Sequence, residues 1–262
     1  MKSLVLASTF CFLAGMAGLA QADAAPASLG QRVATAPVNG QGERIAAASG
    51  TVISERRDAT GFSAIHLSGP IDLELKASDR EGVTVKADAS VVPLVETRVT
   101  GGDRPALEIR VKPDTAFRAS RSPVVVVEFR SLSELVVRGS GKVRADRIDA
   151  NDFALSMAGS GDVRIAALHA NLFGAVLSGS GDLKVGGRAD QQAYALSGSG
   201  DVAAPRLEGR SVKISISGSG DATVHASESL EVSIAGSGSV IYRGSPRVSQ
   251  TISGSGRVRQ AH

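Results

Sequence analysis

The tripeptide Gly-Ser-Gly occurs seven times in the C-terminal half of the chain, and no other feature constrains its fold as strongly. The first glycines of successive copies are 18 to 20 residues apart. They are Gly139, Gly159, Gly179, Gly198, Gly218, Gly236 and Gly254. Self-similarity at a nearly fixed period of this length is the sequence signature of a solenoid, in which each repeat is one structural unit.

Alignment of the repeats on this glycine produces two columns that are apolar in every copy. The column two residues before the glycine holds Val137, Met157, Leu177, Leu196, Ile216, Ile234 and Ile252. The column four residues after it holds Val143, Val163, Leu183, Val202, Ala222, Val240 and Val258. One unit cannot bury such an inner face alone, whereas stacked units can, because like residues then lie on like residues and the backbones pair between coils.

The repeat therefore predicts an all-β fold: a parallel β-helix, or β-solenoid, of about seven regular coils over residues 132–262. A right-handed path is expected for strands that return parallel to their predecessors. We expect both glycines of each corner to adopt φ > 0, where glycine meets no steric penalty. The last coil has Gln250 and Gln260 at inner positions and also carries Arg257 and Arg259. It is therefore expected to form a polar cap against edge-to-edge stacking.

Residues 51–131 are predicted to form an irregular N-terminal β region of the same domain (51–262). Apolar residues alternate with polar ones at positions 65–75 and 107–111, which is the period of a half-buried strand. Residues 124–127 are four consecutive valines, as expected of a strand covered on both faces. Before this region, residues 23–50 are rich in Ala, Pro, Gly, Ser and Gln and are predicted to be a flexible linker.

Residues 1–22 have the pattern of a secretory signal peptide. Lys2 precedes an apolar run over residues 4–20, and Ala20-Gln21-Ala22 is a typical cleavage site. We expect a periplasmic or extracellular protein with no membrane span after cleavage, although an uncleaved anchor is the alternative. The single cysteine, Cys11, lies in this segment, so the processed chain has no thiol and no disulfide.

Taken together, these motifs resemble the head GIN domain of putative autotransporter adhesins, a family of unknown function. The resemblance extends from about Val52 to Arg259 and is carried by residues 61–73, by Gly82-Val83-Thr84-Val85, and by the Ser-Gly-Ser-Gly-Asp corners. It implies a β-helical, exported, envelope-associated protein with no established activity and no catalytic residues to transfer. The membrane barrel of a self-contained autotransporter is not present in this sequence.

The acidic residue after the corner is the sharpest candidate for a metal site. Stacking would bring Asp162, Asp182, Asp201 and Asp221 close enough to bind Ca²⁺ through carboxylate oxygens. Aspartates in turns more often accept hydrogen bonds from backbone N–H groups. Lys142, Arg164 and Lys184 would then be their neighbouring counter-charges. We favour this structural role and predict no metal site.

No pattern in the sequence indicates catalysis or a cofactor. The serines lack a nucleophile elbow, and the histidines lack metal-ligand spacing. The 29 basic and 26 acidic residues are interspersed, which argues against nucleic-acid binding, and no Trp is available to stack on sugars.

Residues facing outward before each corner are mostly Ser, Ala and Thr, which makes that face flat. We therefore expect a non-enzymatic exported scaffold, or adhesin-like envelope protein, that binds an unknown protein or polysaccharide of the cell envelope. The flat small-residue face would be the docking surface for that partner or for a second copy in a homo-oligomer. The alternatives are a polysaccharide-active β-helix enzyme and an accessory periplasmic domain in envelope signalling.

Overall fold

The computed structural model describes residues 44–47, 50–102, 104–113, 115–118 and 122–261. The predicted signal peptide (1–22) and most of the predicted linker (23–50) lie outside these residues. Inside that linker, β1 (Arg44–Ala47) is a strand that pairs in parallel with β8 (Thr115–Arg118).

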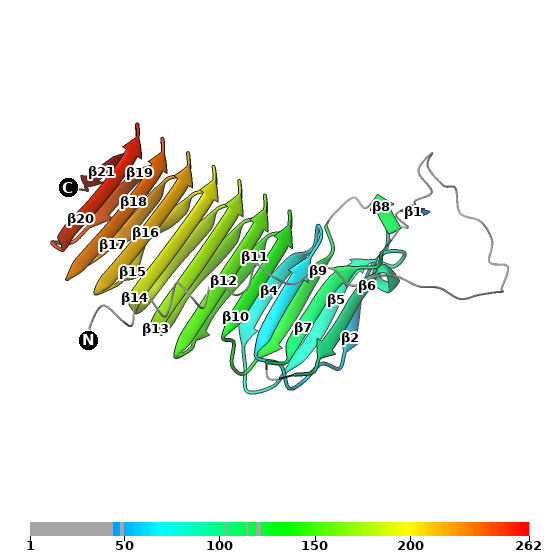
Figure 1. Ribbon diagram of the computed structural model, residues 1–262. Helices are drawn as coiled ribbons and strands as arrows, with labels where there is room; N and C mark the ends of the chain where they lie inside the picture. Colours follow the sequence, from blue (N-terminus) through cyan, green and yellow to red (C-terminus); the bar gives the residue numbers. More distant parts are fainter. Residues whose placement is uncertain (1–43, 48–49, 103, 114, 119–121, 262) are drawn as a thin grey trace.

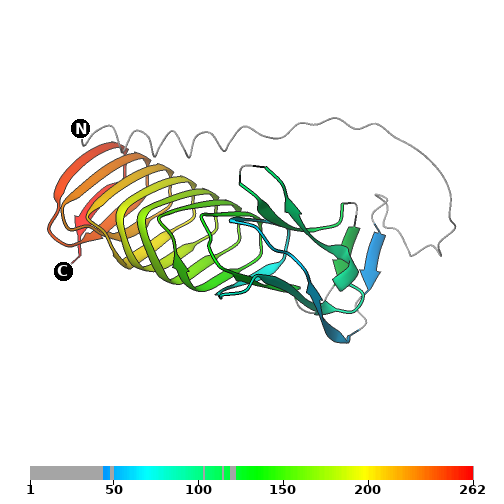
Figure 2. The same cartoon turned by 90° about the horizontal axis from the view of Figure 1, so that it is seen from below.

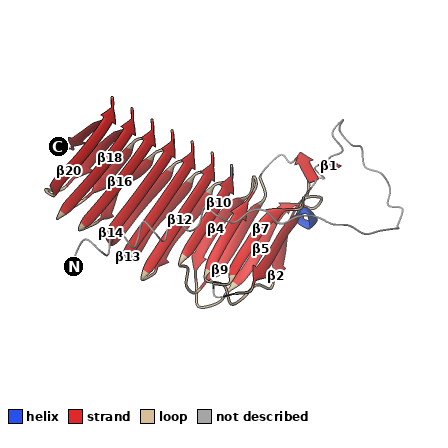
Figure 3. Cartoon of the chain, viewed as in Figure 1, coloured by secondary structure: helices blue, strands red, loops and turns tan. Residues whose placement is uncertain are grey.

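Apart from one 3-10 turn, η2 (Val92–Leu94), the regular structure of the described chain is entirely strand (Figure 3). The strands of the N-terminal region are β2 (Val52–Arg57), β3 (Ala64–Ser68), β4 (Asp72–Ala77), β5 (Gly82–Asp88), β6 (Val95–Thr100), β7 (Ala106–Val111) and β9 (Val124–Phe129). The strands of the repeat are β10 (Glu134–Gly139), β11 (Val143–Asp149), β12 (Asp152–Gly159), β13 (Val163–Gly179), β14 (Leu183–Gly198), β15 (Val202–Glu208), β16 (Ser211–Gly218), β17 (Ala222–His225), β18 (Ser229–Gly236), β19 (Ser239–Arg243), β20 (Arg247–Gly254) and β21 (Arg257–Gln260).

The repeat is a stacked parallel β-solenoid, as the sequence predicts (Figures 1 and 2). Each coil has a longer strand that ends at the corner glycine and a shorter segment that follows the corner. The longer strands form the long-strand sheet, made of β10, β12, residues 172–179 of β13, residues 191–198 of β14, β16, β18 and β20. The shorter segments form the short-strand sheet, made of β11, residues 163–170 of β13, residues 183–189 of β14, β15, β17, β19 and β21.

The register agrees with the columns read from the sequence. Val137 pairs with Met157, Met157 with Leu177, and Leu177 with Leu196. Both columns are buried in the solenoid, except at the last coil, where Ile252 is 38% exposed. Hydrophobic burial along these columns, at about 1.5–3 kcal/mol for each large side chain, is the main force that holds the coils together.

The two glycines of a corner are required for different reasons. Gly179 has φ +122°, whereas Gly181 is outside the positive-φ region, so the expectation of φ > 0 is wrong for the second glycine. A Cβ on Gly181 would lie only 2.1 Å from the carbonyl oxygen of Gly161 in the preceding coil. Close stacking of the corners, and not backbone conformation, therefore excludes a side chain at the second position.

The core also contains one buried polar cluster that the apolar columns do not reveal. Phe153 stacks on Phe173 at 5.9 Å between ring centroids, and Phe173 meets Tyr194 edge-on at 5.8 Å. The Tyr194 hydroxyl donates to Gln192 Oε1 at 2.9 Å, and Gln192 Nε2 donates to the carbonyl oxygens of Ala189 and Leu207, both at 3.2 Å. The cluster is fully hydrogen-bonded, and burial raises the pKa of the Tyr194 phenol.

The predicted N-terminal β region caps the solenoid in an order that differs from chain order. β3 lies between β7 and β10 and is parallel to both, and β4 lies likewise between β9 and β11. The cap is completed by antiparallel strands: β5 pairs with β9 and β2, and β6 pairs with β7. Residues 124–127, the valine run, form most of β9, a central strand between β4 and β5.

Candidate binding surfaces

The corner aspartates form a ladder that bonds one coil to the next. The backbone N–H of Asp221 donates to Asp201 Oδ1 at 2.8 Å, and the N–H of Ser239 donates to Asp221 Oδ1 at 2.7 Å. The N–H of Asp201 meets Asp182 Oδ1 at 3.3 Å in the same way. Asp162 accepts no comparable bond from the residues that the structure describes. These carboxylates thus satisfy backbone donors between coils, which is the role that turn aspartates commonly have.

Nothing in the described residues gathers three or more His, Cys, Asp or Glu side chains in a metal-binding group. The predicted counter-charges also behave differently from expectation. Within the described chain, Lys142, Arg164 and Lys184 form no ion pair with the ladder. The reason is geometric: the carboxylates turn toward the backbone of the next coil instead of toward the neighbouring column.

Some of the outward-facing charges elsewhere on the solenoid are paired. Asp149 accepts hydrogen bonds from Arg147 Nε at 2.6 Å and contacts His169 Nδ1 at 3.1 Å. The hydrogen bond and the charge of Arg147 lower the pKa of the Asp149 carboxyl. Lys213 Nζ donates to Glu231 Oε1 of the next coil at 2.7 Å. Such exposed pairs contribute little stability.

A shallow hollow near the N-terminal end of the stack is lined by charged side chains that neutralise one another. Its walls come from β6 and β7 and include Arg57. Arg98 pairs with Glu108 at 2.8 Å, and Arg110 pairs with Glu96 at 3.0 Å. The hollow is therefore a polar surface in which these charges are paired, although Lys112 also lines it and forms no ion pair in the described chain.

The outer side of the long-strand sheet carries a surface built mainly of small residues, and we call it the small-residue face. Three of its four outward columns from β12 to β18 make up this face and contain only Ala, Gly, Ser and Val, apart from the paired Lys213 and Glu231. Their members from β12 to β18 are Ala154, Gly174, Ala193, Lys213, Glu231, Ser156, Val176, Ala195, Ser215, Ser233, Ala158, Ser178, Ser197, Ser217 and Ala235. The fourth column, at the strand starts, holds Asp152, Leu172, Gln191, Ser211 and Ser229 and borders the face. The structure thus brings together the two small-residue columns noted in the sequence and adds a third.

A polar border closes the small-residue face toward the N-terminal cap. Glu134 occupies the same outward column as Ala154 and is 8% exposed, and its Oε1 lies 3.2 Å from His66 Nε2. The sequence gives no signal for this contact, because the same column also contains Lys213 and Glu231. This half-buried pair marks where the small-residue face ends.

Residues 61–246 match the family described as putative auto-transporter adhesin, head GIN domain. The chain belongs to this family. The match covers well over half of the chain and includes six of the seven Gly-Ser-Gly corners, so the resemblance of the motifs is confirmed. No curated protein matches the chain.

Solved structures with the same fold come from species of Bacteroides and Parabacteroides. A putative adhesin from Bacteroides fragilis superposes with a TM-score of 0.77 at 23% identity, over 82% of this chain and 99% of its own. A structure from Parabacteroides distasonis, described as a putative lipid binding protein, superposes with a TM-score of 0.71 at 24% identity. The match covers 83% of this chain and 100% of that one. A putative adhesin from Parabacteroides merdae superposes with a TM-score of 0.64 at 20% identity, over 83% of this chain and 99% of its own. At these identities the likeness shows the fold alone.

The names of these three relatives are those of adhesins or a lipid-binding protein and not of enzymes. Membership of an adhesin family is consistent with an exported or envelope protein. Among the described residues, no helix has the length and apolar character needed to span a membrane.

Proposed function

We propose that this chain is a non-catalytic binding module of the cell envelope whose small-residue face docks onto a partner protein or polysaccharide. The observation that carries the proposal is the uniformity of that face. In its three columns, from β12 to β18, the outward side chains are short apart from Lys213 and Glu231, which pair with each other.

Short side chains favour docking for an energetic reason. Ordering each long, flexible side chain at an interface costs about 0.5–1.5 kcal/mol, and Ala, Gly and Ser have little or no such freedom to lose. A flat sheet of these residues also lets a partner approach the backbone closely over a wide area.

The solenoid supports this role because it holds the face rigid. Every coil from β12 to β18 is hydrogen-bonded to a coil on each side, and the corner aspartates add further coil-to-coil bonds. A preorganised surface retains more of its contact energy on binding. The family name and the envelope location expected from the sequence point in the same direction.

Arginine substitutions on the two sheets test the proposal. Ser197→Arg with Ser217→Arg places two long charged side chains on adjacent coils of the small-residue face. Ala203→Arg with Thr223→Arg makes the matched change on the short-strand sheet. The purified chain and both double variants are assayed for binding to envelope fractions of the native cells and, separately, to lipid vesicles.

We expect the Ser197/Ser217 variant to bind envelope at least tenfold more weakly, with an unchanged melting temperature, and the Ala203/Thr223 variant to bind normally. Equal binding by all three proteins would rule out the small-residue face as the docking surface. Binding to vesicles instead of to envelope protein or polysaccharide would identify a lipid surface as the partner.

A further inference from the structure

The last coil leaves one edge of each sheet without a partner in the described chain. β20 pairs with β18, and β21 pairs with β19, but no described strand pairs with the other side of either. In the corner before, the carbonyl oxygen of Gly236 accepts the N–H of Ser255 at 2.9 Å. No donor of the described chain meets the equivalent oxygen of Gly254. These free backbone groups are a template for one more strand.

The floor of this edge mixes exposed apolar side chains with the predicted cap residue Gln250, which lies between Val248 and Ile252 in the inner column of β20. Val248 and Ile252 are 39% and 38% exposed, although Leu230 and Ile234 in the same columns of the preceding coil are 1% exposed. The predicted cap residue Gln260 does not cover them, because its Nε2 donates to Gly244 of its own end of the stack at 2.7 Å. The edge therefore combines unpaired backbone with unburied core side chains.

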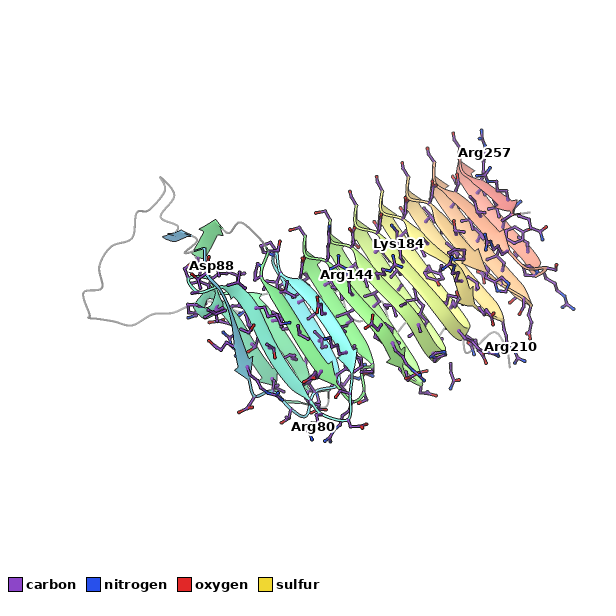
Figure 4. All side chains as sticks on the ribbon, turned by 180° about the vertical axis from the view of Figure 1, so that it is seen from behind. Arg80, Asp88, Arg144, Lys184, Arg210 and Arg257 are labelled. Carbon is purple, nitrogen blue, oxygen red and sulfur yellow. The ribbon has the colours of Figure 1, made fainter. Side chains whose placement is uncertain are left out.

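The same end of the molecule is uniformly basic. Residues 232–262 contain four arginines and no aspartate or glutamate. These arginines are Arg243, Arg247, Arg257 and Arg259, and all four are exposed. None forms an ion pair in the described chain, whereas Arg147, Arg188 and Arg210 of the earlier coils do. Figure 4 shows Arg257 at the last coil, at the opposite end of the stack from Asp88.

We propose that this edge binds an extended, acidic segment of another protein, which adds to the solenoid as an extra strand. Strand addition supplies main-chain hydrogen bonds for affinity, and alternate side chains supply specificity. On β21, Arg257 and Arg259 face outward and Val258 faces the core. A strand lying beside it is therefore matched by an acidic–apolar–acidic sequence.

The charge of the edge also decides against a second copy of this chain as the occupant. Two such edges brought together would oppose their arginines, and juxtaposed like charges disfavour association. An acidic segment instead gains from the attraction and from covering Val248 and Ile252. This site is separate from the small-residue face, so it does not depend on the function proposed above.

The test uses the full chain and a fluorescently labelled peptide of alternating glutamate and valine. Its controls are a lysine–valine peptide and a glutamate–valine peptide N-methylated at alternate residues, which cannot complete the strand hydrogen bonds. The edge variant is Arg257→Glu with Arg259→Glu. The matched variant is Arg144→Glu with Arg164→Glu, which reverses two exposed, unpaired charges on the same sheet inside the stack.

We expect the acidic peptide to bind, measured by fluorescence anisotropy, and neither control peptide to do so. The edge variant should bind it at least tenfold more weakly with an unchanged melting temperature, whereas the matched variant should bind normally. Weakening by added salt is expected because the arginines are exposed.

Three results would overturn the proposal. Equal binding of the N-methylated peptide would mean that charge alone attracts it and that no strand is added. Equal loss in the two variants would place the site elsewhere. Dimerisation of the wild-type chain that the edge variant abolishes, measured by sedimentation, would make a second copy the occupant.

Discussion

Alanine substitutions at three glycines can separate the two constraints that a corner imposes. Gly61 has φ +76° and open space around its missing Cβ, so Gly61→Ala reports the cost of positive φ alone, about 1–2 kcal/mol. Gly181→Ala reports the steric contact alone, because a Cβ there would lie 2.1 Å from Gly161 O. Gly179→Ala combines both, with φ +122° and a contact of 2.2 Å to Gly159 O.

The cost of the contact can be worked out from the hydrogen bonds beside it. To relieve it, the two coils must separate locally by about 1 Å, which weakens the bond from Ser180 N to Gly159 O (3.0 Å) and the bond from Val163 N to Asp182 O (2.8 Å). Each is worth about 1 kcal/mol, and overpacking adds about 1–3 kcal/mol. We expect Gly181→Ala to cost about 3–5 kcal/mol and Gly179→Ala about 4–6 kcal/mol.

Urea unfolding followed by far-ultraviolet circular dichroism measures these free energies. Ser180→Ala is the control, because this exposed side chain lies between the two glycines and should change stability by less than about 0.5 kcal/mol. If Gly181→Ala were no more destabilising than Gly61→Ala, close stacking of the corners would not be the reason for the second glycine.

Three further predictions concern the core and the ladder. Met157→Asp should unfold the neighbouring coils, whereas Ser178→Asp, which faces outward, should be nearly silent; equal effects in chemical unfolding would contradict the register. Millimolar Ca²⁺ should leave the melting temperature unchanged. Asp221→Asn should lower the free energy of unfolding by about 1 kcal/mol or less, because the amide oxygen still accepts the N–H of Ser239. A calcium-dependent rise in melting temperature that is lost in the variant would indicate a metal site instead. The pKa of Tyr194 is raised in the folded state, so the neutral phenol stabilises the fold. This contribution to the free energy of unfolding is complete below the ordinary tyrosine pKa of about 10 and decreases as the pH rises above that value. Tyr194→Phe should therefore flatten the loss of stability between about pH 10 and 12, and an unchanged pH profile would count against this assignment.

The regular coils could be predicted from the sequence almost residue by residue. The Gly-Ser-Gly corners mark the period of the coils. A slip of one residue would turn every inner side chain outward, so only one register buries the apolar columns. The pairing of Val137 with Met157 and of Met157 with Leu177 follows directly.

The N-terminal cap could not be predicted in the same way. Alternation of apolar and polar residues indicates a strand but is the same for parallel and antiparallel neighbours, so nothing at residues 64–68 reveals that β3 lies between β7 and β10. Among the candidate sites, the sequence predicts a structural role for the corner aspartates. It does not predict that they accept hydrogen bonds from the next coil, because residue types alone do not determine side-chain conformations.

The interleaved cap has a consequence for how the chain folds. Successive coils bring together residues 18 to 20 apart, whereas β3 meets β10 through pairs such as Ala64 with Glu134, 70 residues apart. By loop-closure entropy alone, the longer connection costs about 1 kcal/mol more. The coils can therefore form by nearest-neighbour zipping, but β3 and β4 acquire their second partners only after the chain has passed residue 134. We expect the cap to be completed late in folding, after the coils that follow it in the sequence have begun to assemble.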